Sequence, residues 1–180
     1  MIFLLFNLAF SAGMNIDWKH NSFKEAMESE SKIEFHMKSK KAGLVTTSFE
    51  GVAKEVSISF NETKDTYTDI KISIASNGLD TDVDGRNEKM WDLCLSADTY
   101  KSIVVSLPKV LKDSEPQKVE GEITIRDKSY PVDVSVVVNE QGLEGDSTLS
   151  LKGLDIPDPS IWIASVLDPI AIKFKITMHK

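Results

Sequence analysis

The chain has 180 residues, of which 41% are hydrophobic and 27% are charged, and its formal net charge is −7 at pH 7. Such a composition is typical of one soluble globular domain that is long enough to bury a core without disulfide bonds or metals. The negative charge argues against nucleic acid and anionic membrane surfaces as partners, because both carry phosphate.

The N-terminal segment MIFLLFNLAFSAG is apolar and ends in small residues. It is too short for a membrane span, which needs about 20 residues, but it is typical of a secretory signal peptide. We therefore expect a signal peptide over residues 1–13, cleaved after Ser11 or Gly13, and a periplasmic or secreted protein. No basic residue precedes the apolar run, and a buried N-terminal strand is the alternative.

A helical extension is expected over about residues 17–30, at the start of a single domain that fills residues 14–180. Ser22 and Glu25 have the spacing of a capping box, in which each side chain accepts a backbone hydrogen bond at the start of a helix. Phe23, Ala26 and Met27 share one helical face.

From residue 32 onwards, apolar residues recur at every second position, which is the period of a strand with one buried face. Gly51 is expected to mark a bulge or a bend. Antiparallel sheets with one solvated face show this alternation, and many strands joined by short turns are typical of a sandwich or a closed barrel. The pattern predicts eight or nine strands: 32–38, one bent or two short strands in 43–60, 69–76, 101–111, a hairpin over 117–139 that turns at Asp127 and Lys128, 145–153 and 170–180.

A barrel of about eight strands has an interior that either is filled by side chains or holds one small ligand. The inward-facing residues here are almost all Ile, Val, Leu, Phe and Met. An open interior would therefore hold an apolar ligand, whereas a filled interior would make the protein a scaffold. The alternation of residues leaves both alternatives open.

Asp80, Asp82 and Asp84 alternate and Gly85 follows, as in the first half of a helix–loop–helix calcium site. That motif needs a bidentate glutamate at its twelfth position, where this chain has Trp91, and it needs a preceding helix where this chain has a predicted strand. We therefore expect no metal site. The aspartates are interpreted as turn residues that accept backbone N–H bonds and pair with Arg86.

Residues for catalysis are not evident. The three histidines, His20, His36 and His179, are not spaced as metal ligands, and no nucleophile, phosphate-binding or dinucleotide motif is present. The single Cys94 lies among apolar residues and is interpreted as a small buried hydrophobic residue. We expect no enzymatic activity and no cofactor.

The acidic loop and the segments after it resemble the YceI-like family, which comprises bacterial, commonly exported lipocalin-like proteins. The resemblance covers about residues 31–178. Arg86 and Asn87 match an Arg-Asp or Arg-Asn pair of the family, and Tyr100 matches a strand start. Residues 121–125 match a hairpin, and residues 157–162 match a proline-bearing loop. Lys89 stands where the family frequently has histidine.

The resemblance implies an all-β, antiparallel, lipocalin-like barrel of about eight strands with one or two short helices and a long apolar tunnel. It also implies non-enzymatic binding, and transport or storage, of a polyisoprenoid or similar long-chain lipid, including quinone-type tails. We expect the ligand to contact aromatic, methionine and isoleucine side chains, which could also be plain core residues: Phe35, Met37, Ile72, Ile74, Met90, Trp91, Tyr100, Trp162 and Phe174.

The expected partner is thus a long-chain apolar small molecule, with no nucleic acid and no stable membrane insertion, and a homodimer stays open. The alternative is a scaffold or interaction protein with a filled barrel, which acts through the acidic loop at residues 80–84.

Overall fold

The computed structural model describes residues 12–41, 44–160 and 164–178. These residues form a strand-rich molecule with two short α-helices, α1 (Phe23–Glu28) and α2 (Asp84–Lys89), a 3-10 turn η1 (Ser76–Gly78) and a π-helical turn η2 (Met90–Leu95). The strands are β1 (Ala12–Lys19), β2 (Lys32–Lys41), β3 (Val45–Ala53), β4 (Glu55–Glu62), β5 (Thr66–Ala75), β6 (Leu79–Asp80), β7 (Ser102–Leu111), β8 (Gln117–Ile125), β9 (Lys128–Asn139), β10 (Gly142–Leu149) and β11 (Ala164–Thr177).

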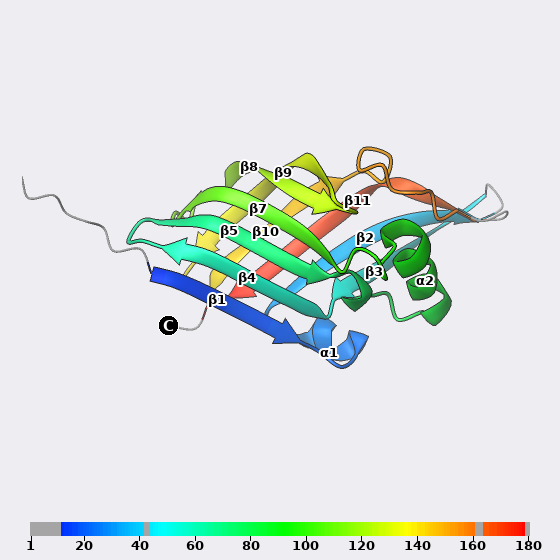
Figure 1. Cartoon of the computed structure of the whole chain (residues 1–180), viewed down its shortest axis with the longest axis horizontal. Coiled ribbons are helices and arrows are strands. Elements are labelled where there is room, and N and C mark those ends of the chain that lie inside the picture. The colour runs from blue at the N-terminus through cyan, green and yellow to red at the C-terminus, as the bar shows by residue number, and fades with distance from the viewer. Residues whose placement is uncertain (1–11, 42–43, 161–163, 179–180) are drawn as a thin grey trace, which may run out of the picture.

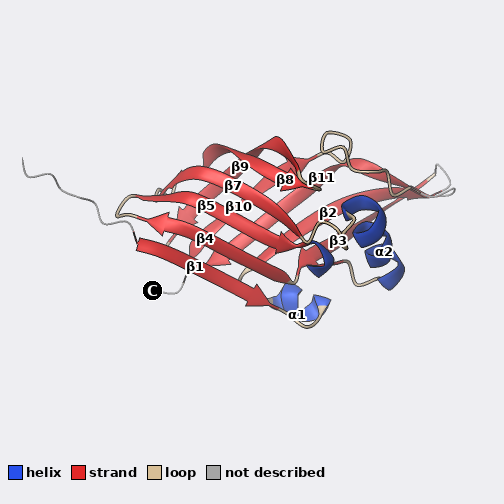
Figure 2. Ribbon diagram, viewed as in Figure 1, coloured by secondary structure: helices blue, strands red, loops and turns tan. Residues whose placement is uncertain are grey.

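All eleven strands belong to one antiparallel sheet, with the order β1-β4-β5-β7-β8-β9-β10-β11-β2-β3-β6. Figure 1 shows this sheet curled into a half-barrel, and Figure 2 shows how few helical segments accompany it. The prediction of an antiparallel all-β fold is confirmed. The predicted number of about eight strands is wrong, and among the described residues no strand pairing joins the edge strands β1 and β6 into a closed barrel.

The chain turns a corner at Lys54, which decides between the two alternatives predicted for residues 43–60, while β1 and β6 account for the strands beyond the predicted eight or nine. The Lys54 N–H donates to the Gly78 carbonyl at 2.9 Å, and the Lys54 carbonyl accepts from the His20 N–H at 2.8 Å. The predicted segment 43–60 therefore contains two strands, β3 and β4, with different neighbours: β3 pairs with β2 and β6, and β4 pairs with β1 and β5.

Helix α1 is shorter than the predicted extension over residues 17–30. Ser22 Oγ accepts a hydrogen bond from the Glu25 N–H at 3.2 Å, as expected for a capping residue. Glu25 Oε2 accepts from the Asn21 N–H at 2.8 Å, so the reciprocal bond reaches one residue before the predicted one. Residues 17–19 belong to β1, which begins inside the predicted signal peptide, while residues 1–11 lie outside the described residues.

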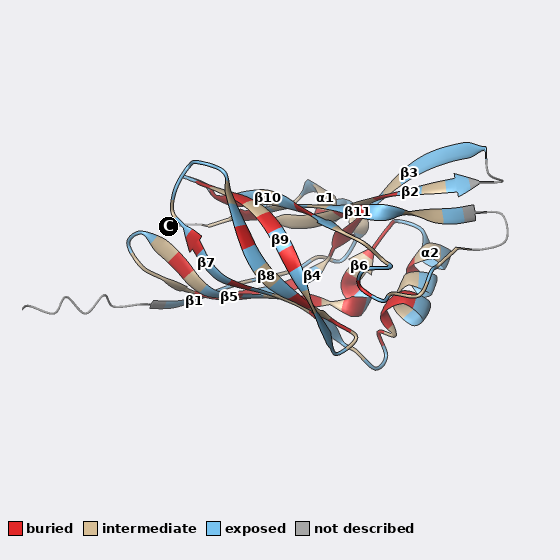
Figure 3. Ribbon diagram, turned by 90° about the horizontal axis from the view of Figure 1, so that it is seen from above, coloured by how far each residue is buried: buried red, intermediate tan, exposed pale blue. Residues whose placement is uncertain are grey.

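The alternating strand residues form the core on the concave side of the sheet. In β9, Val132, Val134, Val136 and Val138 are buried, and Figure 3 shows this alternation along the strands. The β8–β9 hairpin turns at Arg126 and Asp127, whose φ angles are 52° and 57°, and not at Asp127 and Lys128. Two positive φ angles in a two-residue loop match the right-handed twist of the flanking strands.

Helix α2 and the turn η2 lie at one end of the curled sheet, beside the β2–β3 hairpin (Figures 1 and 3). None of the described helices has the length and apolar character needed to cross a membrane.

Candidate functional site

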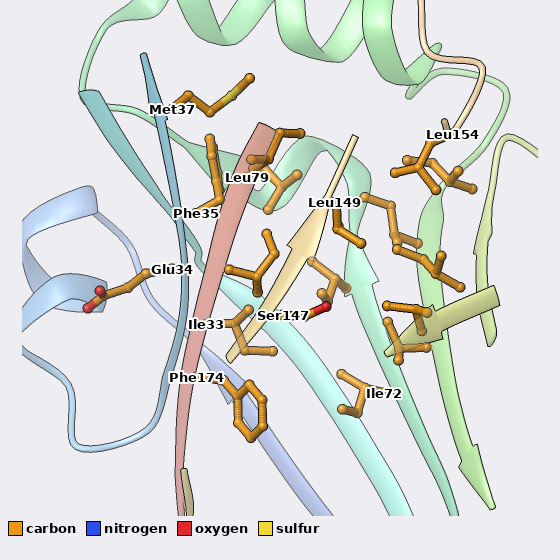
Figure 4. Close-up of a pocket in the computed structure, with 18 of the residues that line it drawn as sticks. Ile33, Glu34, Phe35, Met37, Ile72, Leu79, Ser147, Leu149, Leu154 and Phe174 are labelled. Atoms are coloured by element: carbon orange, nitrogen blue, oxygen red, sulfur yellow. The ribbon is translucent and has the colours of Figure 1, made fainter. Parts of the chain in front are cut away.

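A cavity of about 280 Å³ lies inside the curl of the sheet. Strands β2, β3 and β5 through β11 contribute side chains to its wall, together with α2, η2 and the segment between β10 and β11. The lining is almost entirely aliphatic and aromatic. Figure 4 shows lining side chains that extend from Phe174 at one end to Met37, below the helix, at the other.

Most of the predicted ligand contacts lie around this cavity. The side chains of Phe35, Met37, Ile72, Ile74, Met90 and Phe174 line it. Trp91 and Tyr100 are not among its lining residues: Trp91 Nε1 donates to the Leu79 carbonyl at 2.8 Å and anchors η2, and Tyr100 lies in the loop before β7. Trp162 lies outside the described residues.

The cavity also contains residues that the sequence analysis did not single out. Some occupy inward positions of strands, and the period of two could have identified these: Ile33, Phe49, Val105, Ile123 and Val134. Others lie between β10 and β11, such as Leu151, Leu154 and Ile156. Leu151 falls within the predicted strand 145–153, although β10 ends at Leu149, whereas Leu154 and Ile156 had no local signal in the sequence.

Gly51 makes room for one of the lining side chains. It is paired with Phe35 in the register of β2 and β3, without the predicted bulge or bend in the pairing. A Cβ atom at Gly51 would lie 2.1 Å from Phe35 Cζ, so the aromatic ring covers the glycine backbone. A glycine is required because any side chain would occupy the position of the ring.

The acidic loop fastens α2 to the sheet. Asp80 Oδ1 accepts hydrogen bonds from Asn87 Nδ2 and from the Asp82 N–H, both at 2.9 Å, and Asp80 Oδ2 pairs with Lys54 Nζ at 2.8 Å. The interpretation of Asp80 as an acceptor of a backbone N–H is confirmed. The predicted ion pair with Arg86 is wrong, because Lys54 occupies the position of the counter-ion.

The environment of Asp80 changes its acidity. Burial raises the pKa of the Asp80 carboxyl group, but hydrogen bonds from Lys54, Asp82 and Asn87 outweigh this effect, and the pKa is lowered from its ordinary value. Asp82 and Asp84 are exposed. No group of three or more His, Cys, Asp or Glu residues within the described ranges is arranged to hold a metal ion.

Arg86 lies at the edge of the cavity. Its guanidinium carbon lies 4.3 Å from the centroid of the Phe49 ring, and burial lowers the pKa of Arg86 from its ordinary value. A cation above an aromatic face is attracted by the negative charge of the ring face. Arg86 and Phe49 thus border the end of the cavity at which Met37, the β2 partner of Phe49, also lies.

Cys94 is buried, as expected, and also contributes to the cavity wall. Its Sγ atom donates a weak hydrogen bond to the Pro157 carbonyl at 3.8 Å. Burial raises the pKa of the Cys94 thiol to about 11. Because the thiolate is the nucleophilic form, this thiol is unreactive near neutral pH.

Comparison with solved structures identifies similar folds. The structure of BcnA from Burkholderia cenocepacia has a TM-score of 0.62 and 20% sequence identity, and the match covers 81% of this chain and 94% of BcnA. A polyisoprenoid binding domain from Saccharophagus degradans has a TM-score of 0.56 and 14% identity, with coverage of 80% and 94%. A mutant CJ YceI protein with a monobromobimane guest has a TM-score of 0.55 and 14% identity, with coverage of 76% and 89%. At these identities, the similarity concerns the fold alone.

No curated protein sequence matches the chain. The family model of the YceI-like domain matches residues 25–178, which is nearly the whole of the described structure. The cavity-forming strands and the helix α2 all lie within this match. The chain therefore belongs to the YceI-like family.

Proposed function

We propose that this protein binds a long apolar chain, such as a polyisoprenoid or another long-chain lipid, without chemical conversion, in the cavity inside the curled sheet. The observation that carries this proposal is a cavity of about 280 Å³ with an almost entirely hydrophobic lining. Membership of the YceI-like family and the fold shared with a polyisoprenoid binding domain support it.

The hydrophobic effect is sufficient to hold such a ligand. Burial of one methylene group contributes roughly 0.8 kcal/mol, so a chain of about fifteen carbons contributes on the order of 10 kcal/mol before ordering costs are subtracted. Orientation needs few polar contacts. The high pKa of the Cys94 thiol, about 11, supports a binding role in preference to nucleophilic catalysis.

The proposed role is transport or storage of the lipid outside the cytoplasm, in the periplasm or the medium. The apolar N-terminal segment followed by small residues supports export. Fractionation of cells that express the full chain, with N-terminal sequencing of the product, tests this part. A cytoplasmic product that retains Met1 would contradict it.

The binding proposal is tested by purification from the native host without detergent, followed by extraction and mass spectrometry. We expect a long-chain lipid in a fixed ratio to the protein, and we expect delipidated protein to be stabilised against heat when an isoprenoid alcohol is added. Protein that is repeatedly free of lipid and insensitive to isoprenoids would overturn the proposal. The scaffold alternative, acting through residues 80–84, predicts a filled interior and stabilisation by calcium instead.

A further inference from the structure

The cavity wall contains a small set of polar and charged side chains, and most of them already have partners. In the described part of the chain this set is Glu34, Thr81, Arg86, Lys89 and Ser147. Glu34 points away from the cavity in Figure 4, and its Oε1 atom pairs with Lys32 Nζ at 2.6 Å. Glu34 therefore offers the ligand no free charge.

The two hydroxyl groups are also engaged. Thr81 Oγ1 donates to Asn87 Oδ1 at 2.7 Å, and Ser147 Oγ donates to the Asp133 carbonyl at 2.7 Å. The cations Arg86 and Lys89 remain.

Arg86 and Lys89 lie three residues apart on α2, a spacing that places their side chains next to each other on a helix. Arg86 is half-buried above the Phe49 ring, and Lys89 is exposed. Within the described residues, neither side chain has a hydrogen bond or an ion pair with the protein. The Phe49 ring compensates only part of the solvation that the half-buried guanidinium loses, and no carboxylate neutralises its charge, so an anion at this position is favoured.

Nearby carboxylates do not supply that anion. Asp80 is engaged by Lys54 and Asn87. Asp84 and Glu88 are exposed on α2 and form no ion pair with Arg86 or Lys89 in the described structure. The α2 end of the cavity thus presents positive charge next to an apolar wall.

We infer that the ligand is a single-chain lipid with an anionic oxygen head group, a carboxylate or a phosphate monoester, which Arg86 and Lys89 bind at the α2 end of the cavity. This inference rests on the proposed function, and it names the class of ligand. The planar guanidinium of Arg86 matches two oxygen atoms of either group, and Lys89 adds a second positive charge. The chain extends from the end near Met37 toward Phe174 (Figure 4). A cavity of about 280 Å³ suits one chain better than a lipid with several chains.

The test compares three probes with the same chain, hexadecanoate, hexadecyl phosphate and hexadecanol, at about pH 8, where a carboxylic acid is ionised. Their dissociation constants are measured with delipidated wild-type protein and with Arg86→Gln, Arg86→Lys and Lys89→Gln. Lys64→Gln is the matched control, because Lys64 is exposed in the β4–β5 turn, at the opposite end of the sheet from α2 (Figure 1).

We expect wild-type protein to bind at least one anionic probe about tenfold more tightly than the alcohol, since hydrogen bonds to charged groups are among the strongest. The better anionic probe identifies the head group as carboxylate or phosphate. Arg86→Gln should lose this preference and bind the alcohol as wild type does, and Lys89→Gln should lose part of it. Arg86→Lys should retain part of it, and Lys64→Gln all of it.

Equal affinity of wild-type protein for all three probes would overturn the inference, and so would an undiminished preference in Arg86→Gln. Alcohol binding by Arg86→Gln shows that this variant is folded. If Arg86→Gln does not fold, the inference is tested by the preference of wild-type protein for the anionic probes over the alcohol and by the reduction of this preference in Arg86→Lys. An undiminished preference in Arg86→Lys, or equal binding of all probes by wild type, would count against it. Failure of all three probes to bind wild-type protein would count against the proposed function itself.

Discussion

Asn87 Nδ2 donates a hydrogen bond of 2.9 Å to Asp80 Oδ1, which joins helix α2 to strand β6. The Asn87 side chain also accepts from the Thr81 N–H at 2.8 Å and from Thr81 Oγ1 at 2.7 Å. Asn87 is only 4% exposed. One buried amide therefore satisfies three groups and fixes the helix that carries Arg86 at the cavity.

Replacement of Asn87 should destabilise the fold. Asn87→Ala removes partners of the buried Thr81 N–H and of Asp80 Oδ1, and an unsatisfied buried polar group costs about 1–3 kcal/mol. We expect the free energy of unfolding in urea to fall by that amount. Glu88→Ala, at the next, exposed position of the same helix, should change it by no more than about 0.5 kcal/mol. Equal effects of the two substitutions would show that the amide network contributes nothing.

The lowered pKa of Asp80 predicts a pH dependence of stability. Its folded-state pKa lies below the ordinary value of 3.8, so the ionised carboxylate stabilises the fold at pH values above 3.8. This contribution is lost as the pH falls below 3.8 through the folded-state pKa. Urea unfolding of wild-type protein and Asp80→Asn across the acidic range should give curves that differ above 3.8 and converge at lower pH. A constant difference would contradict the prediction.

The local period of the side chains is sufficient to predict much of the cavity wall. Phe35 and Met37 on β2 and Ile72 and Ile74 on β5 alternate with polar residues, and each such run lies within one strand with one inward face. A period of two therefore identifies these residues without knowledge of the neighbouring strands.

The tertiary partners were not predictable in the same way. Lys54 lies next to Asp80 because the chain turns a corner between β3 and β4. The expected pairing of Arg86 with the aspartates used only their proximity in the sequence, which contains no information on that corner. Trp91 looked like a ligand contact because it is aromatic, whereas its indole N–H is used by the Leu79 carbonyl. Side-chain type alone does not distinguish a cavity wall from an anchor.

A bulky residue at Ile72 should block lipid binding. Ile72 lines the cavity toward the end at which Phe174 lies (Figure 4), and Ile72→Trp would displace several methylene groups of the ligand, each worth roughly 0.8 kcal/mol. Displacement of two or three groups weakens binding by more than about tenfold. Titration of delipidated protein with a fluorescent long-chain lipid measures this change.

Lys71→Trp is the matched control for Ile72→Trp, because Lys71 is the adjacent residue on the exposed face of the same strand. It should leave the lipid affinity unchanged. Unchanged affinity in Ile72→Trp as well would place the bound chain outside this cavity.

The contact between Gly51 and Phe35 predicts a substitution that disturbs both stability and binding. Gly51→Ala removes backbone freedom from the unfolded chain, which alone would stabilise the protein by about 0.4–1 kcal/mol. The new Cβ atom, 2.1 Å from Phe35 Cζ, forces the ring to move, and such overpacking costs about 1–3 kcal/mol. We expect net destabilisation in urea unfolding and weaker lipid binding, because Phe35 lines the cavity.

Gly85→Ala is the control for Gly51→Ala. It lies on a helix where the new Cβ atom meets no neighbouring part of the protein within 4 Å, and it should instead stabilise by about 0.5–1 kcal/mol. In Phe35→Ala protein the ring is absent, so Gly51→Ala should no longer be destabilising there. Additive effects of the two substitutions would show that the ring does not cause the loss.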